Sequence, residues 1–277
     1  MNRLLQCLMV FIATIALAQT NRFIYELRYK LDSTKNEYKT KEVVLDINPD
    51  NVKFYEYGFL PADSLNRLHG NMSNKYTSQA EQTLIRNKNS FQNNNYLQIW
   101  MMPYYYHIKT KDEMSWNISD QIKTENGFKM QKATTHFGGR NWIAWFTPDI
   151  PISEGPYKFR GLPGLILKIE DDKQNFIYTF SRNKNLPTTF STEQFVENHY
   201  NMKPITITFP VWVKLKKEFY NDPYARMRAE FQPDWDVEIN KRKIKNKEEF
   251  YELTPDMQKS IREYYANPVE LDKAIKY

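Results

Sequence analysis

The sequence predicts an α+β protein that is mainly β, with a curved antiparallel meander sheet followed by a charged, helical C-terminal part. Residues 23–31 alternate in polarity, with Phe23, Tyr25 and Leu27 on one side of the chain, as in a half-buried strand. Turn sequences separate this segment from later short segments of the same kind, so neighbours are expected to pair as hairpins. Strands do not alternate with helices, which argues against a parallel α/β sheet.

The first half of the chain repeats this pattern of short strands. Residues 42–47 and 52–57 are expected to be strands joined by an Asn-Pro-Asp-Asn turn at 48–51. One or two helical turns are expected over 61–68, and an Asn-rich loop over 87–95. Four more short strands are predicted at 82–87, 96–101, 104–109 and 114–118.

The clearest hairpins lie in the middle of the chain. Asn126-Gly127 is a two-residue turn signal that precedes an expected strand over 128–137. Gly138-Gly139-Arg140 forms the next turn, and 141–147 returns with Trp142 and Trp145 on opposite, equally apolar faces. That strand is therefore expected to be central in the sheet. Residues 165–170 and 175–181 predict a further hairpin around residues 171–174.

Residues 155–166 read GPYKFRGLPGLI and are interpreted as a tightly folded loop that enters a buried strand. Glycine allows a positive φ or a close backbone approach, whereas proline fixes φ and removes a donor. The residues that follow are apolar and β-branched, as in a buried strand. The residues expected to have a structural role in this motif are Gly155, Pro156, Gly161, Leu162, Pro163, Gly164, Leu165 and Ile166.

Three parts are predicted along the chain: a signal peptide over residues 1–18, an antiparallel β domain over 19–185, and a helical region over 186–277 packed on the sheet. The helical region is expected to begin with a short helix over 192–200 and a last strand over 205–209, with helices from residue 214 onward. Thr254-Pro255 and Asn267-Pro268 have the pattern of helix starts. The basic run 241–247 is interpreted as a solvated helix face or as a contact with anionic envelope lipid.

The first residues predict the location of the protein. A basic start at 1–3, an apolar stretch over 4–15 and Ala16-Leu17-Ala18 are typical of a signal peptide cleaved near Ala18. The mature protein is therefore expected in the periplasm or associated with the outer membrane, with no transmembrane segment. Cys7 is the only cysteine, so no disulfide or thiolate site is expected after cleavage. Export and a net charge of only +6 argue against a nucleic-acid partner.

The sequence assigns no catalytic residue, cofactor or metal ion. It contains no catalytic or phosphate-binding motif, and its four histidines lack metal-ligand spacing. Basic residues beside glycine-rich turns, namely Arg140, Lys158 and Arg160, could hold a carboxylate, phosphate or sulfate near an exposed Tyr157, or could tie loop carbonyls together. The candidate ligand or partner contacts are Arg140, Trp142, Trp145, Tyr157 and Arg160.

Residues 144–147 (AWFT), 150–152 (IPI) and 155–166 (GPYKFRGLPGLI) resemble the GLPGLI family of exported Bacteroidota proteins. The segment 131–142 is similar to the stretch that precedes the signature in that family. The resemblance implies an exported, strand-rich protein, and it implies no catalytic residues because the family has no established biochemical function. The strand pattern is also similar, as a fold analogy only, to the curved sheet of periplasmic lipoprotein carriers.

Three functions remain open from the sequence. The first is a non-enzymatic periplasmic binding or envelope accessory protein, with an aromatic groove lined by residues such as Trp142 or Trp145. Its partner would be a small apolar ligand, a peptide, a lipid or an outer-membrane protein. The alternative is a periplasmic hydrolase with a site assembled from distant residues. The third is an assembly or transport accessory that acts through the charged helical tail.

Overall fold

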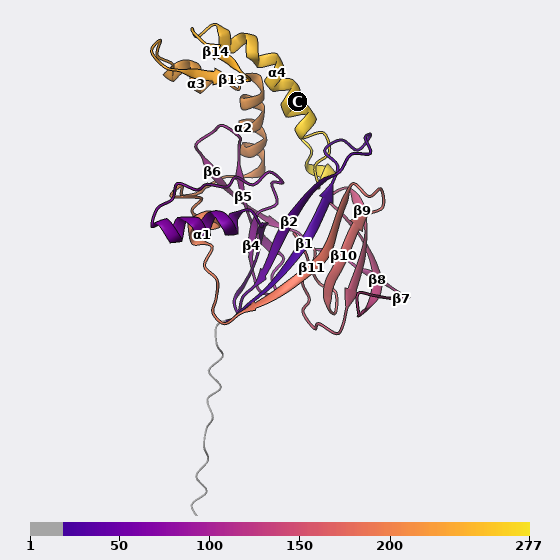
Figure 1. Cartoon of the computed structure of the whole chain (residues 1–277). Helices are drawn as coiled ribbons and strands as arrows, with labels where there is room; N and C mark the ends of the chain where they lie inside the picture. The colour runs from indigo at the N-terminus through magenta and orange to yellow at the C-terminus, as the bar shows by residue number, and fades with distance from the viewer. Residues whose placement is uncertain (1–18) are drawn as a thin grey trace, which may run out of the picture.

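The structure is a computed structural model that describes residues 19–277 (Figure 1). The predicted signal peptide, its cleavage site and Cys7 lie outside the described residues. Within the described part, one 12-stranded sheet dominates, in the order β12-β6-β5-β4-β3-β2-β1-β11-β10-β9-β8-β7. The mainly β, antiparallel fold class is confirmed, and the sheet is open, with β12 and β7 at its two edges.

Two runs of hairpins build this sheet. The first consists of β1 (Thr20–Tyr29), β2 (Lys39–Ile47), β3 (Asn51–Glu56), β4 (Leu84–Asn87), β5 (Gln92–Gln98) and β6 (Tyr105–Lys111). The second consists of β7 (Asn117–Glu125), β8 (Phe128–Phe137), β9 (Arg140–Thr147), β10 (Leu165–Asp171) and β11 (Phe176–Leu186). The runs join because β1 pairs with β11 along its whole length, with Tyr29 opposite Phe176. Strands distant in sequence therefore lie side by side at the centre of the sheet.

The two faces of the sheet bury different clusters. Alternate residues of β2 point to opposite faces, so Val43 packs in the inner cluster and Val44 in the outer one. The outer face is covered by α1 (Phe59–His69) and by a short π-helical turn, η1 (Glu193–Glu197). Phe59 and Phe195 stack there with their ring centroids 5.4 Å apart. The predicted helix over 61–68 is confirmed as α1.

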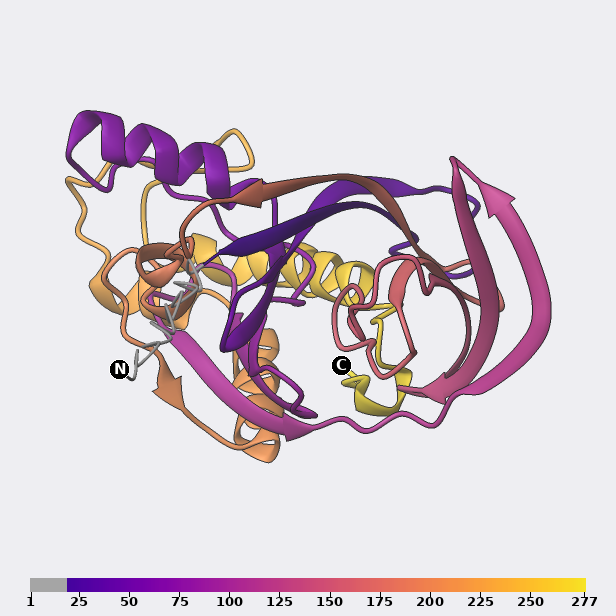
Figure 2. The same cartoon turned by 90° about the horizontal axis from the view of Figure 1, so that it is seen from below.

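The inner face curves around the loop that carries the GLPGLI sequence (Figure 2). Phe159 and Leu162 of this loop are buried in the inner cluster, where Phe159 contacts Trp142 of β9 at a centroid distance of 4.5 Å. The phenol of Tyr25 on β1 donates to the main-chain oxygen of Ile166 (2.8 Å). The loop thus supplies core side chains to the sheet that it leads into.

The C-terminal part begins with β12 (Ile205–Thr206), which pairs with β6 in the only parallel register of the described sheet. Then follow α2 (Phe209–Asn221), α3 (Ala225–Glu230), the hairpin of β13 (Val237–Ile239) and β14 (Arg242–Ile244), α4 (Glu249–Tyr264) and the 3-10 turn η2 (Leu271–Lys273). α4 packs against α2, and Gln258 donates to the main-chain oxygen of Tyr220 (3.0 Å).

Several local predictions for the C-terminal part were wrong. The last strand ends at Thr206, because Phe209 and Pro210 begin α2. Thr254-Pro255 lies inside α4, whose buried face runs through Phe250, Leu253 and Met257. Asn267-Pro268 starts no α-helix. The basic run 241–247 lies on and beyond the β13–β14 hairpin, not on a helix face.

The Asn-rich loop was also predicted too long, since β5 already begins at Gln92. Asn93 and Asn95 are buried, and their side-chain amides donate to the Asp112 carboxylate (2.9 Å) and the Ile108 main-chain oxygen (3.0 Å). Their amide NH2 groups therefore have acceptors inside the fold, whereas the buried Oδ1 of Asn93 accepts no hydrogen bond. Over residues 19–277, no helix combines the length and the apolar character that crossing a membrane requires.

Candidate functional site

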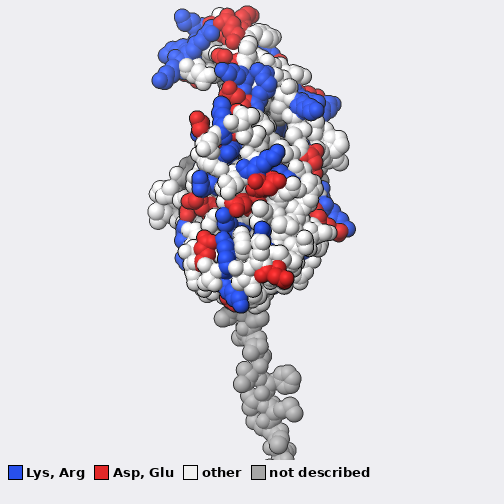
Figure 3. Space-filling model, turned by 90° about the vertical axis from the view of Figure 1, so that its right-hand side faces the viewer, with Lys and Arg blue, Asp and Glu red and all other residues white. Residues whose placement is uncertain are grey.

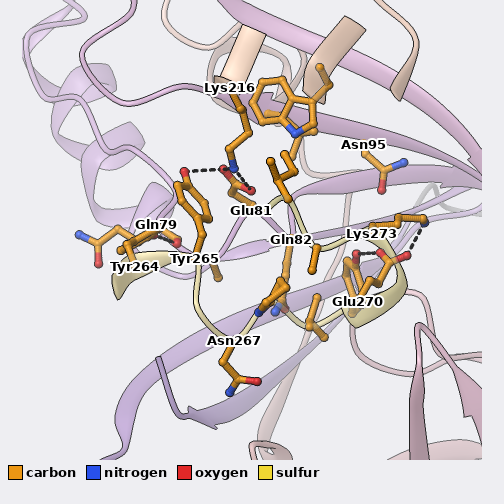
Figure 4. Close-up of a pocket in the computed structure, with 18 of the residues that line it drawn as sticks. Gln79, Glu81, Gln82, Asn95, Lys216, Tyr264, Tyr265, Asn267, Glu270 and Lys273 are labelled. Atoms are coloured by element: carbon orange, nitrogen blue, oxygen red, sulfur yellow. Dashed lines mark hydrogen bonds and ion pairs between the residues drawn. The ribbon is translucent and has the colours of Figure 1, made fainter. Parts of the chain in front are cut away.

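A cavity of about 150 Å³ lies on the inner side of the sheet, beneath the end of the chain (Figure 4). Its floor comes from β1, β5, β6 and β11, through side chains such as Leu97 and Phe176. Trp212 of α2 forms one wall, and the roof is the C-terminal segment 267–277, here called the strap. The lining is mainly aromatic and aliphatic. Every ionised side chain that lines this cavity has a partner of opposite charge.

One end of the cavity is closed by an ion pair that the sequence did not suggest. The ammonium group of Lys216 on α2 lies 3.0 Å from the Glu81 carboxylate and 3.3 Å from the centre of the Tyr265 ring. The Tyr265 phenol donates to the same carboxylate (2.8 Å). Burial lowers the pKa of Lys216, and the Glu81 carboxylate opposes this shift. The charges at this end therefore cancel, and the Glu81 carboxylate already accepts from both Lys216 and Tyr265.

A second group of charged residues, the strap cluster, lies at the other end and consists of Asp112, Lys158, Glu270 and Lys273. Lys158 lies 2.7 Å from Glu270 and 3.1 Å from Asp112, and Lys273 pairs with both acids. The Tyr157 phenol also donates to the Glu270 carboxylate. Burial raises the pKa of Glu270, but the pairs with Lys158 and Lys273 outweigh it, so the pKa lies below its ordinary value.

The turn between β8 and β9 holds the strap. Arg140 donates to the main-chain oxygens of Pro268 (2.7 Å) and Val269 (3.0 Å) and to the Asn267 side chain (2.5 Å). The amide of Leu271 donates to the Gly138 oxygen (2.6 Å). Gly138 has φ +61°, and a Cβ atom there would lie 3.1 Å from the Glu270 Cα, so glycine allows the strap to approach this turn.

A third group, the motif cluster, lies deeper and consists of Arg86, Glu154 and Arg160. Arg86 is fully buried and pairs with Glu154, which also accepts from Arg160 (3.2 Å). Arg86 further donates to the Tyr157 main-chain oxygen (2.8 Å). Trp116 donates to the Arg160 oxygen (2.8 Å). These contacts attach the loop to β4 at Glu154 and Tyr157, and to Trp116 just before β7 at Arg160.

The candidate contacts predicted from the sequence have different surroundings. Trp142 is fully buried in the inner core, and Trp145 is half-buried beneath Lys123, so neither lines the cavity beneath the strap. Tyr157 lines it but is buried, in contrast to the expected exposure. Arg140 and Arg160 are buried in ion pairs, with Arg140 binding carbonyl oxygens.

The motif residues lie mostly in the interior. Gly155, Pro156, Leu162, Gly164, Leu165 and Ile166 are buried, whereas Gly161 and Pro163 are exposed. A Cβ atom on Gly164 would lie 2.6 Å from the Thr147 carbonyl carbon, and one on Gly155 would lie 2.8 Å from the Ile166 side chain. Close backbone approach therefore requires glycine at both positions.

The sequence missed Glu81, Lys216, Asp112 and Glu270, which are distant from one another along the chain. No spacing rule links residues brought together only by folding. Glu270 adjoins Asn267-Pro268, which the sequence singled out for another reason. Lys158 was noted as a possible holder of a carboxylate, and in the structure it pairs with the carboxylates of Glu270 and Asp112.

The histidines form no acid–base site in the described part of the chain. His199 is buried, stacks on Tyr105, and its ring Nδ1 lies 3.4 Å from the Phe195 oxygen. Burial lowers its pKa. Within residues 19–277, no histidine hydrogen-bonds to a carboxylate, and no group of three His, Cys, Asp or Glu side chains could hold a metal ion.

Charges of both signs are interspersed over the face seen in Figure 3, and a basic group gathers at the end that carries the β13–β14 hairpin. Lys241, Lys243 and Lys245 are exposed there. Lys243 pairs with Asp236 (3.1 Å), and Arg242 pairs with Glu252 (2.6 Å). Part of the basic run is thus neutralised locally.

Comparison with known proteins locates one family match. Residues 102–168 match the model of a family described as "Protein of unknown function (Porph_ging)". The matched segment contains the GLPGLI sequence, and the GLPGLI family name itself stays a prediction. A search of curated proteins returned no match.

Two solved structures are similar at low identity. "Structure of PNGF-II in P21 space group" has a TM-score of 0.48 and 11% identity, covering 72% of this chain and 33% of that one. "Structure of PNGF-II in C2 space group" has a TM-score of 0.46 and 12% identity, covering 69% and 31%. The chain thus spans about a third of the length of these structures, and the likeness carries no argument about function.

Proposed function

We propose that this protein is an exported, non-enzymatic binding protein of the cell envelope that holds an apolar molecule on the inner face of its sheet. The observation that carries the proposal is the cavity beneath the strap, which is walled by aromatic and aliphatic side chains with its charges paired at both ends. Concave, mostly apolar pockets with few polar groups are typical of ligand sites. The predicted signal peptide supports the envelope location.

The absence of a histidine–carboxylate pair among residues 19–277 gives the alternative hydrolase no specific support. In this proposal the charged helical C-terminal region, which includes the strap, covers the binding site. It carries Trp212 and Lys216 on α2 and Tyr265 after α4, all of which line the cavity. Within residues 19–277, we identify no surface that specifically favours an outer-membrane protein as the partner.

Native mass spectrometry of the mature protein, purified gently from its own envelope, tests the proposal. We expect a bound apolar molecule, and we expect binding of the neutral dye Nile red after this molecule is removed. Leu97→Trp should abolish both, because Leu97 lines the cavity. The control is Leu68→Trp on α1, where Leu68 is 76% exposed on the outer side. An empty protein that binds no dye, or equal binding by the two variants, would refute the proposal.

A further inference from the structure

The carboxylate of Glu270 occupies a built anion site at the edge of the cavity. It accepts from the Tyr157 phenol and from Lys158 (2.7 Å), and all three side chains are buried. Tyr157 and Lys158 belong to the loop, whereas Glu270 belongs to the strap. One part of the chain thus presents a carboxylate to a site formed by another part.

We propose that this site binds the head group of the ligand and that the strap fills it in the absence of ligand. The ligand class is a single-chain amphiphile with one anionic end, a carboxylate or a phosphate, which displaces the strap. This inference rests on the proposed function, since it assigns the ligand of the same cavity. Ammonium and phenol donors suit either anion.

The size of the cavity supports displacement. A cavity of about 150 Å³ accepts a molecule of about the size of benzene. A long alkyl chain needs more room, and the strap provides it when it leaves, because Val269, Ala274, Ile275 and Tyr277 form part of the lining. The face uncovered would include Leu97, Ile108 and Phe176, which are apolar.

The charges support an anionic head group. When the strap leaves, Lys158 loses Glu270 and keeps Asp112 as its carboxylate partner, and the Tyr157 phenol loses its acceptor. Arg140 loses the Asn267, Pro268 and Val269 oxygens and keeps Asp171 (3.1 Å). The Lys158 ammonium and the Tyr157 phenol are then available to donate to a new anion at this end.

The strap can leave without dismantling the sheet. It is the end of the chain and contributes no strand to the 12-stranded sheet. Its main-chain bond to the β8–β9 turn runs from Leu271 to Gly138. Its remaining polar contacts there are made by the Arg140 side chain.

A reversible lock on the strap provides the test. A Cβ atom on Gly139 would lie 3.2 Å from the Leu271 Cβ, so a shift of a few tenths of an ångström brings the two atoms into the range of about 3.5–4.5 Å that a disulfide requires. The double variant Gly139→Cys/Leu271→Cys, made in the mature chain without Cys7, would hold the strap closed when oxidised. The two single variants control for the strain at Gly139, whose φ is +73°, and thermal unfolding confirms that each variant folds.

Palmitate and hexadecanol are the probes, because they share an alkyl chain and differ in charge. We expect oxidation of the double variant to weaken binding of both by at least about tenfold, and a thiol reductant to restore it. Lys158→Met should weaken palmitate relative to hexadecanol by about tenfold, because loosening of the strap acts on both probes alike and loss of the ammonium acts on palmitate alone. The control Lys129→Met, at an exposed position on β8, should change neither. Hexadecyl phosphate should behave as palmitate, whereas inorganic phosphate should not compete.

The outcomes distinguish failure of the strap and head-group inference from failure of the proposed function. Equal binding by the locked and reduced forms would overturn strap displacement. An equal effect of Lys158→Met on palmitate and hexadecanol would overturn the head-group assignment. Competition by inorganic phosphate at the same concentration as hexadecyl phosphate would replace the amphiphile with a free anion. Failure of every form to bind palmitate, hexadecanol and Nile red would refute the proposed function itself.

Discussion

The motif cluster and the strap cluster use similar chemistry in different settings. Arg86, Glu154 and Arg160 join the loop to the sheet interior, with side-chain exposures of 6% or less. The strap cluster joins the loop to the end of the chain, and its Lys273 side chain is 30% exposed. The first therefore links parts that cannot separate without unfolding, whereas the second links a part that can.

The difference shows that a buried ion pair does not by itself reveal its role. Breaking a buried pair costs much because the remaining charge has no partner. Where the partner lies on a terminal segment, the expected result of breaking the pair is release of that segment and not unfolding of the whole protein. The predictions below test this contrast, from the largest effect to the smallest.

Gly164→Ala should have the largest effect. The new Cβ atom would overlap the Thr147 carbonyl on β9, so backbone must move inside the core. We expect the free energy of unfolding, measured with urea, to fall by about 4 kcal/mol or more. Gly127→Ala is the matched control, because its Cβ atom would meet open space at φ +81°, and it should cost about 1–2 kcal/mol. Equal losses would show that the contact at Gly164 is unimportant.

Arg86→Met should be the next largest change. It leaves Glu154 with Arg160 as its basic partner and removes the bond to the Tyr157 oxygen. A loss of about 3–5 kcal/mol in unfolding free energy is expected. Arg160→Met should cost less, since it leaves Arg86 on Glu154. If the order is reversed, Arg160 and not Arg86 anchors the loop.

Acidification should release the strap before it unfolds the sheet. The pKa values of Glu270 and Asp112 are lowered in the folded protein, so their contribution to stability is present above their ordinary pKa values and is lost as pH falls through the folded values. Below a pH of about 4, faster hydrogen exchange is expected at the Leu271 amide than at sheet amides.

Glu270→Gln is the control for this pH effect. It should raise exchange at Leu271 already at neutral pH and reduce the dependence on pH, with Asp112 left to titrate. Lys158, Lys273 and Tyr157 face the same carboxylate. Simultaneous exchange of strap and sheet would contradict a separable strap.

Arg182→Ala should have the smallest effect. Its pair with Glu42 links β11 to β2 near the surface, with the Arg182 side chain 46% exposed. Exposed pairs contribute about 0.2–1 kcal/mol and less at high salt. Urea unfolding with and without added salt measures this value. A loss comparable to that of Arg86→Met would show that burial does not decide the cost of these pairs.

Local sequence predicted the hairpins well, because alternation and turn residues act over a few neighbours. Asn126-Gly127 and Gly138-Gly139 lie at the turns of β7–β8 and β8–β9, as expected. The errors occurred where tertiary contacts override local preference. Asn93 and Asn95 lie in a strand, where their side-chain NH2 groups donate to Asp112 and to the Ile108 oxygen. Pro255 lies inside α4 because the buried face of the helix continues past it.

The candidate site was predicted only in part. Lys158 and Tyr157 could be noted beside a glycine-rich loop, but their partner Glu270 lies more than a hundred residues away. Trp142 was expected in a groove, yet the loop itself fills the inner side of the sheet at that point through Phe159. Which face of a central strand meets solvent depends on what packs over it.

The sequence by itself determined the strand-rich class, the turns and the need for glycine at positions such as Gly164, because these follow from backbone sterics and the two-residue period of a strand. Tertiary structure alone decided that β1 pairs with β11, that the strap roofs the inner face, and that Glu270 meets Lys158. These contacts join residues far apart in the chain, and they form only when the burial of apolar surface brings distant segments together.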